Sequence, residues 1–229
     1  MTLLKALSIN GVAFNEVAFD SAKVDVRVSL VHKIETPGTY SCWVVDEYGK
    51  GRRFQIIVTE ATGQDQTLVD CDELFDPQWI IKDVTLSRED YLVFVSMTGA
   101  SQYVIEIVTT DDPPQVAFDS KNVGSNSVIV IAPYLPGTYT IKDEHSGAAA
   151  TLNVLPLEAR FQDAMSDEAV AFYHRIQEEG ALNVTLDGNG FSPNPIELDA
   201  DRPMAIQGSG PMRIVGRVSE MHPLVSAAW

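Results

Sequence analysis

The chain has 229 residues, a length that suits one large domain or two of ordinary size. Apolar residues make up 45% of it, which is enough for a packed core and excludes a mainly disordered protein. The formal net charge is −16 at pH 7, and so acidic a chain repels phosphate groups. This charge excludes nucleic acid as the main partner and argues against binding to an anionic membrane.

An internal repeat is the most informative feature of the sequence. The pentapeptide VAFDS at residues 17–21 returns at 116–120, and the tetrapeptide PGTY at 37–40 returns at 136–139. Both pairs are 99 residues apart. Two matches at one spacing indicate a duplicated structural unit.

The beginning of the chain shows no targeting segment. Its first seven residues are too short and too interrupted to form the apolar core of a signal peptide, and no run is long enough to span a bilayer. We therefore expect a protein that is made and folded in the cytoplasm, unless it leaves within a larger assembly. Cys42 and Cys71 show no framework spacing, so two reduced thiols are expected, and a disulfide between them is the alternative.

Short runs with period-two alternation or with β-branched residues succeed one another along the chain and predict strands. Turns rich in glycine, proline and aspartate separate them. Many short strands at close spacing are typical of a sandwich or a barrel. The predicted strands cover residues 24–30, 53–58, 91–96, 103–108, 127–132, 151–154, 181–186, 204–207 and 212–218.

One helix is predicted in the segment that joins the second repeat to the C-terminal strands. Ser166 is a suitable N-cap, and acidic residues follow it in the first turn. Apolar side chains then recur on one helical face, and Gly180 suits the position just after the last turn. These signals predict a helix over residues 167–179.

A weaker repeat links the middle of the chain to its C-terminal part. The Phe-x-Pro motif at Phe75 returns at Phe191, and two predicted strands follow each copy. Residues 75–156 therefore contain a Phe-x-Pro half followed by a PGTY half. Residues 1–60 hold only a PGTY half, and residues 190–229 hold only a Phe-x-Pro half.

We therefore expect residues 75–156 to form a complete sandwich, and residues 1–60 to form half of a second one that residues 190–229 complete. Residues 61–74 then serve as a linker, and residues 157–189 as a helical connector. Half a sandwich exposes an apolar face and unpaired strand edges, so it needs completion. Closure within the chain is favoured by its high effective concentration, and strand exchange with a neighbouring subunit is the alternative.

The hairpin around the first PGTY copy resembles the last hairpin of immunoglobulin-like domains. In that family a G-x-Y-x-C strand carries a tyrosine whose hydroxyl bonds back to nearby backbone and a cysteine that pairs with an earlier strand. Tyr40 and Cys42 match this pattern, but no cysteine precedes them, so the family's disulfide cannot form. The second copy has Ile141 at the cysteine position and is similar to disulfide-free immunoglobulin-like repeats of bacterial and phage surface proteins.

The Phe-x-Pro motif also resembles the first strand of cupredoxins, another family of Greek-key sandwiches. Cupredoxins bind copper through two histidines, a cysteine and an axial methionine. The family's cysteine position falls on Trp43 in the first copy and on Lys142 in the second, and neither is a ligand. His145 lies near the place of a ligand histidine but stands alone. This resemblance implies a copper-free fold, and we expect no metal and no cofactor.

No constellation of residues predicts catalysis. The sequence contains no G-x-S-x-G motif, P-loop or dinucleotide fingerprint. Its histidines share no metal-ligand spacing, so surface or hydrogen-bonded side chains are the favoured interpretation. We therefore expect a protein that is not an enzyme and has no catalytic residues. The four histidines are His32, His145, His174 and His222.

Three acidic runs resemble calcium-binding segments in part. Residues 70–73 and 111–112 match neither an EF-hand nor a glycine-aspartate repeat. Residues 187–190 have the chemistry of a tight turn but lack a third acidic position. Solvated turns are the favoured interpretation of all three runs.

The tryptophans and the C-terminal tail are the candidate contact residues. Trp43 and Trp79 suit a binding face, but packing within a sandwich is the favoured interpretation of both. Trp229 ends an apolar, uncharged tail, which is unusual for a free terminus. We therefore predict an interface made by Leu224, Val225 and Trp229, either with the N-terminal half or with a neighbour.

Together these features predict an all-β protein of two Greek-key sandwiches, immunoglobulin-like or cupredoxin-like, with one intervening helix. The expected function is that of a non-enzymatic structural or decoration subunit of a large assembly, with a bacteriophage virion (capsid or tail) as the leading candidate. The expected partners are proteins, including further copies of the chain through strand exchange. The alternative is a binding module that recognises a carbohydrate or a cell-surface protein through its loops.

Overall fold

The computed structural model describes residues 17–61, 65–78, 82–133, 135–155, 178–200 and 202–221. Over these residues the chain forms strands in three sheets and the short helix α1 (Cys71–Phe75). The prediction of an all-β protein is confirmed.

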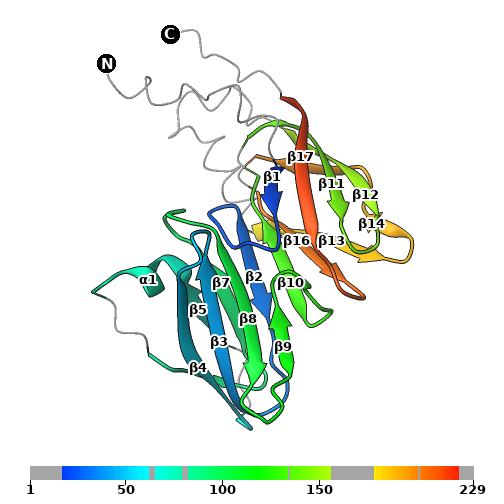
Figure 1. Ribbon diagram of the computed structural model, residues 1–229. Helices are drawn as coiled ribbons and strands as arrows, with labels where there is room; N and C mark the ends of the chain where they lie inside the picture. The colour runs from blue at the N-terminus through cyan, green and yellow to red at the C-terminus, as the bar shows by residue number, and fades with distance from the viewer. Residues whose placement is uncertain are drawn as a thin grey trace, which may run out of the picture.

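A seven-stranded sheet runs through the middle of the molecule and belongs to both of its halves (Figure 1). Its strands lie in the order β14-β13-β16-β10-β2-β7-β5. The two strands at the junction, β2 and β10, are antiparallel, with Leu30 opposite Ile129. The bounds are β2 Val28–His32, β5 Gln66–Asp70, β7 Tyr91–Val95, β10 Ser127–Ile131, β13 Leu182–Asp187, β14 Gly190–Ser192 and β16 Met204–Gly208.

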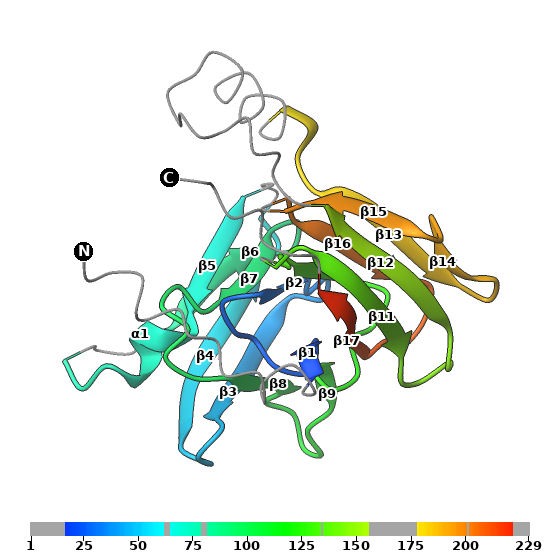
Figure 2. The same cartoon turned by 90° about the horizontal axis from the view of Figure 1, so that it is seen from above.

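Two five-stranded sheets cover the two halves of the seven-stranded sheet (Figures 1 and 2). The first, in the order β6-β4-β3-β8-β9, lies against β2, β7 and β5 and forms lobe 1 with them. The second, in the order β1-β17-β11-β12-β15, lies against β10, β16 and β13 and forms lobe 2. The bounds are β1 Val17–Asp20, β3 Gly38–Asp46, β4 Gly51–Thr59, β6 Val84–Ser87, β8 Tyr103–Thr109, β9 Val116–Asp119, β11 Gly137–Asp143, β12 Ala149–Leu155, β15 Ile196–Asp199 and β17 Ile214–Met221.

The duplication seen in the sequence extends to the strand pairing of the two lobes. In lobe 1, β3 pairs with β4 and β8, as β11 pairs with β12 and β17 in lobe 2, all antiparallel. The parallel pairs also correspond, since β4–β6 and β5–β7 match β12–β15 and β13–β16. Leu30 and Ile129, which face each other at the junction, are themselves 99 residues apart. An approximate twofold axis therefore passes between them and relates the lobes.

The strand pairing differs from the expected division of the chain. Strands β2, β3 and β4 are completed by β7, β8 and β6, all from residues 84–109, and not by residues 190–229. The expected unit at 75–156 is divided, because its Phe-x-Pro half lies in lobe 1 and its PGTY half in lobe 2. In this sequence the two kinds of half alternate, so the second PGTY half has a Phe-x-Pro half on either side and the first has one only after it. The structure pairs each PGTY half with the one that follows.

The segments expected to be connectors also contribute strands. The expected linker at 61–74 contains β5 and most of α1. The expected helical connector at 157–189 contains β13. Both strands lie in the seven-stranded sheet, at corresponding places in the two lobes, and each pairs in parallel with the strand beside it.

One short strand of each repeat crosses to the other lobe. β1 pairs with β17 in lobe 2, whereas β2 to β8 of its repeat lie in lobe 1; its counterpart β9 pairs with β8 in lobe 1. The crossing segments are joined by a hydrogen bond of 2.7 Å from the Ser120 hydroxyl to the Ala22 carbonyl. The Ser21 hydroxyl accepts from the Ile214 amide at 2.8 Å. The C-terminal part of the chain therefore meets the N-terminal part through the β1–β17 pair.

An ion pair fastens β1 to lobe 2. The Arg213 guanidinium donates through Nε and Nη2 to the Asp20 carboxylate, at 3.1 and 2.8 Å. Burial by itself raises the pKa of Asp20, but the hydrogen bonds from Arg213 and from the Ala22 amide outweigh it and hold the pKa below its ordinary value. Such a two-point contact fixes the position of a strand that is only four residues long.

Each lobe contains the tyrosine hydrogen bond that the immunoglobulin resemblance implies. The Tyr40 hydroxyl donates to the Thr36 carbonyl at 2.7 Å, and the Tyr139 hydroxyl donates to the Leu135 carbonyl at 2.5 Å. Both tyrosine side chains are buried, so each bond satisfies a polar group that would otherwise lose its hydration without compensation.

Three smaller expectations concern the thiols, the helix and the membrane. Cys42 and Cys71 are free and buried, as expected. Of the helix predicted over 167–179, only Glu178 and Glu179 are described; they are helical, and Gly180 follows with a φ of 63°. The other positions of that helix lie outside the described residues. No helix in the described part of the chain is long and apolar enough to cross a membrane.

Substitution of Gly216, a glycine in β17, tests whether β1 packs on that strand. The Phe19 ring lies directly over Gly216, and a Cβ at position 216 would lie 2.2 Å from a ring carbon. We expect Gly216→Ala to lower the free energy of unfolding by about 1–3 kcal/mol, because the ring and β1 must shift. Urea unfolding measures this, with Gly188→Ala as the control, since nothing lies within 4 Å of a Cβ there. Equal stability of both variants would contradict the packing of β1 on β17.

Candidate interaction surface

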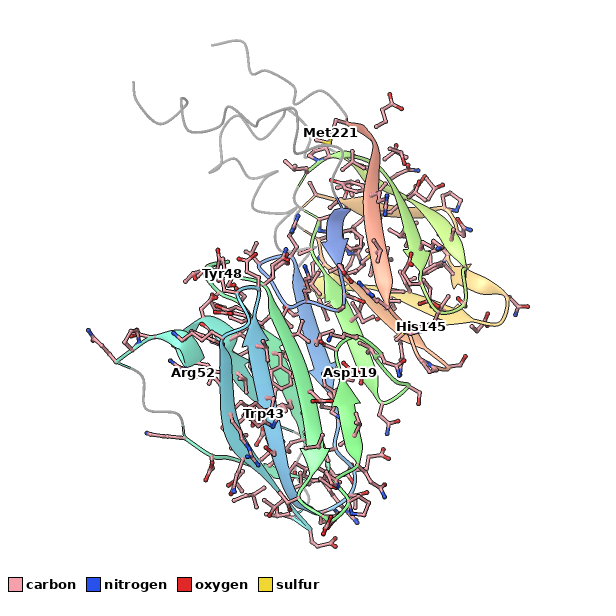
Figure 3. The ribbon with its side chains drawn as sticks, in the orientation of Figure 1. Trp43, Tyr48, Arg52, Asp119, His145 and Met221 are labelled. Carbon is pink, nitrogen blue, oxygen red and sulfur yellow. The ribbon has the colours of Figure 1, made fainter. Side chains whose placement is uncertain are left out.

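Apolar side chains are exposed on the outer face of the five-stranded sheet of lobe 1. This lobe 1 outer face consists of the outward positions of β3, β4, β8 and β9. Trp43 on β3 is 40% exposed, Ile57 on β4 is 36% exposed and Val116 on β9 is 61% exposed. Figure 3 shows Trp43 on the side of β3 that faces away from the seven-stranded sheet. The half-buried outward side chains of the same face are Val45, Val104 and Val108.

Strand alternation places Trp43 on this face. Its neighbours Cys42 and Val44 point into the core and are fully buried, so Trp43 between them must point outward. Side chains directly opposite on the two adjacent strands are Arg53 on β4 and Glu106 on β8. The centre of the face is therefore an aromatic ring flanked by one cation and one anion.

Arg53 is held in place against the ring of Trp43. The centre of its guanidinium lies 5.1 Å from the ring centroid, and its Nε donates to the Ser41 hydroxyl at 2.6 Å. Stacking of this kind suits arginine, whose planar group is weakly hydrated. Among the described residues, neither Arg53 nor Glu106 takes part in an ion pair within the chain.

The second lobe shows that the fold does not require an apolar surface here. Trp43 corresponds to Lys142 on β11, which lies at the same place in the pairing pattern and is exposed. Val108 corresponds to Arg217, and Ile57 corresponds to Asn153. The duplicated scaffold thus carries polar side chains in lobe 2 and apolar side chains in lobe 1 at the same three places.

A hollow of about 470 Å³ beside β9 is lined by His32, a histidine whose pKa is lowered. His32 is buried and its Nδ1 lies 2.9 Å from the Ser127 hydroxyl, which is also buried. Burial lowers the pKa of His32 to about 4, so the ring is neutral at pH 7. Nucleophilic catalysis by such a pair needs a third group that orients the base, and the described residues place no hydrogen-bonded carboxylate on this ring. The Phe118 ring, 4.6 Å away, packs against it instead.

The acidic run at 70–73 is part of the folded structure and not a solvated turn. Asp72 accepts hydrogen bonds from the Thr98 amide at 2.7 Å, the Thr98 and Tyr103 hydroxyls at 2.8 Å and the Ser96 hydroxyl at 3.0 Å. Burial by itself raises the pKa of Asp72, but these bonds outweigh it and lower the pKa. The carboxylate therefore ties α1 to the connection between β7 and β8.

Within the described residues, no three histidine, cysteine or acidic side chains are grouped closely enough to hold a metal ion. In the run at 187–190, Asp187 accepts from the Asn189 amide at 2.7 Å. This is the tight turn that the sequence indicates. His145 contacts the Lys121 carbonyl through Nε2 at 3.3 Å.

The structure changes the interpretation of one predicted contact residue. Sandwich core or strand packing is the favoured interpretation of Trp43 from sequence. The core position is wrong, because the ring lies on the outer face, where it packs against Arg53 of the adjacent strand. The expected interface residues Leu224, Val225 and Trp229 lie outside the described residues, as does Trp79. The signal that would have identified Trp43 is its alignment with Lys142 in the repeat, since a core position does not take lysine.

No family model, no curated protein and no solved structure matches this chain. The arrangement of its own residues is therefore the basis for any functional conclusion.

Replacing the tryptophan by the residue of the second repeat tests whether it belongs to a surface. We expect Trp43→Lys to lower the free energy of unfolding by less than about 2 kcal/mol, because Lys142 occupies the same place in lobe 2. Truncation of a core aromatic costs about 3–5 kcal/mol, so Phe94→Ala is the comparison. If Trp43→Lys proved as destabilising as Phe94→Ala in urea unfolding, Trp43 would be a core residue.

The buried histidine predicts a loss of stability in mild acid. The folded pKa of about 4 lies below the ordinary value of 6.5, so the unfolded chain binds more protons between these values. Stability should fall as the pH drops from 6.5 to 4, by at most about 3 kcal/mol from this residue. The double variant His32→Ile, Ser127→Val carries the kind of apolar pair found at the corresponding Val28 and Ile131, and it should show a weaker pH dependence. Identical slopes for both proteins would rule out a neutral, buried His32.

Proposed function

We propose that the protein is a non-enzymatic structural subunit of a large protein assembly, and that the lobe 1 outer face is its contact surface. The observation that carries the proposal is the difference between the two lobes. The same scaffold places Trp43, Ile57 and Val108 where lobe 2 has a lysine, an asparagine and an arginine. Exposed tryptophan flanked by arginine is typical of the residues that dominate protein interfaces.

The charge of the chain supports a role in a crowded assembly. A net charge of −16 opposes indiscriminate aggregation, so association is directed to faces where the acidic charge is low. On the lobe 1 outer face, Arg53 and Glu106 offset each other around the central tryptophan. Protein partners therefore fit this face better than nucleic acid or an anionic membrane.

We further propose that each lobe is a Greek-key sandwich related to immunoglobulin-like or copper-free cupredoxin-like domains. The support is the tyrosine hydrogen bond present in both lobes, together with the sheet order repeated in each. The PGTY hairpins resemble disulfide-free immunoglobulin-like repeats of bacterial and phage surface proteins, and on this resemblance a phage virion is the leading candidate assembly.

A carbohydrate-binding module is the alternative, because an exposed indole suits stacking against a sugar ring. The guanidinium of Arg53 already lies over the ring of Trp43, which leaves less of the indole available for a sugar. The structural role is therefore the better supported of the two.

Sedimentation of extracts from cells that naturally make the protein tests the proposal. We expect the protein in particles far heavier than its own 25.1 kDa, because a structural subunit resides in its assembly. The Trp43→Lys variant, expressed in place of the natural chain, should shift towards the light fractions, whereas Lys142→Glu in lobe 2 should not. Recovery of the natural protein only in the light fractions would contradict a structural role, and a positive glycan array would then favour the alternative.

A further inference from the structure

We propose that the lobe 1 outer face binds a second copy of this chain, face to face, about a twofold axis parallel to β3. This inference rests on the proposed function, because it names the partner of the same surface. Its evidence is the arrangement of charge on the face, which is complementary to itself.

The two charges directly beside Trp43 lie on its two sides. Arg53 lies on β4, to one side of Trp43, and Glu106 lies on β8, to the other side. Asp119 on β9 lies opposite Glu106 in register and extends the acidic side. β3 runs along the boundary between the cationic side and the acidic side.

This separation selects one orientation for the second copy. Adjacent strands are about 4.8 Å apart, so Arg53 and Glu106 lie at about equal distances on either side of β3. Rotation by 180° about an axis along β3 exchanges the two sides and places Arg53 of each copy against Glu106 of the other. Rotation about an axis across the strands would instead place like charges together, which is unfavourable by several kcal/mol.

The same rotation accounts for the central aromatic residue. Trp43 lies on β3 itself, so it stays at the axis and meets Trp43 of the second copy. Its exposed surface is then buried at the centre of the contact, where tryptophan contributes most to binding. Two oppositely oriented Arg53–Glu106 pairs flank this centre, and neither charge is left unpaired.

The dimensions of the face are sufficient for a stable dimer. Four strands span roughly 19 Å, and strands of seven to nine residues at its centre run roughly 23–30 Å. This footprint is about 500 Å² in projection and larger as accessible surface, which approaches the roughly 800 Å² per partner of a standard interface. The twist of two sheets allows them to stack with nearly aligned strands.

A charge-exchange cycle on the purified full chain tests the proposal. Light scattering and sedimentation equilibrium over a concentration range compare the natural protein with Arg53→Glu, Glu106→Arg and the double variant. We expect a dimer of the natural protein, roughly tenfold or weaker binding by each single variant, and recovery of the dimer in the double variant. Recovery requires the two charges to face each other across a twofold axis, which a different partner would not provide.

Two controls show whether a loss of dimer comes from the proposed contact or from misfolding. Thermal unfolding of each variant shows that the chain is folded, and Lys142→Glu on lobe 2 reverses a charge at the corresponding place outside the proposed contact. A natural protein that stays monomeric, or a double variant that associates no better than the single ones, overturns the proposal. If that monomer still sediments with heavy particles in a Trp43-dependent manner, the structural role stands and the partner is a different protein.

Discussion

The antiparallel pairing of β2 with β10 is the contact on which the rest of the molecule depends. It joins two lobes of the same design into one continuous sheet, so the hydrogen bonds of the junction are those of a sheet interior. Neither innermost strand is left with an exposed edge, which removes two sites where another chain would otherwise pair. The junction therefore offers no free strand edge to a second chain, which is consistent with the proposed contact surface on the outer face of lobe 1.

Much of the fold was accessible from the sequence, because alternation of apolar and polar residues marks a half-buried strand. The predicted strands at 91–96, 103–108 and 127–132 agree with β7, β8 and β10 to within one residue. The sequence does not show which Phe-x-Pro half pairs with which PGTY half, because alternation identifies a strand and not the strand beside it. The sequence also does not show that β1 and β9 each join the other lobe. Both strands have the sequence VAFD within the repeated VAFDS, so no local signal indicates which lobe each one joins.

The surface was harder to predict than the core for a related reason. The two repeats retain what the scaffold needs: Tyr40 and Tyr139 make the same hydrogen bond, and Ser21 and Ser120 are both fully buried. They differ where the scaffold makes no demand, as at Trp43 and Lys142. Tryptophan is found both in cores and at interfaces, so the residue type alone does not show to which of the two Trp43 belongs. The second repeat decides it, because it acts as a natural substitution experiment within one chain.

The β1–β17 pair has a consequence for the order in which the chain is completed during synthesis. Val17 lies opposite Arg217, 200 positions later in the chain, so the first described strand has no partner until the last one has been synthesised. Lobe 1 needs only residues up to 119 and can assemble while the remainder is still being made. Contacts between such distant residues form slowly, because a long loop must close first. The β1–β17 pair is thus among the last contacts that can form, and it links the first described strand of the chain to the last one.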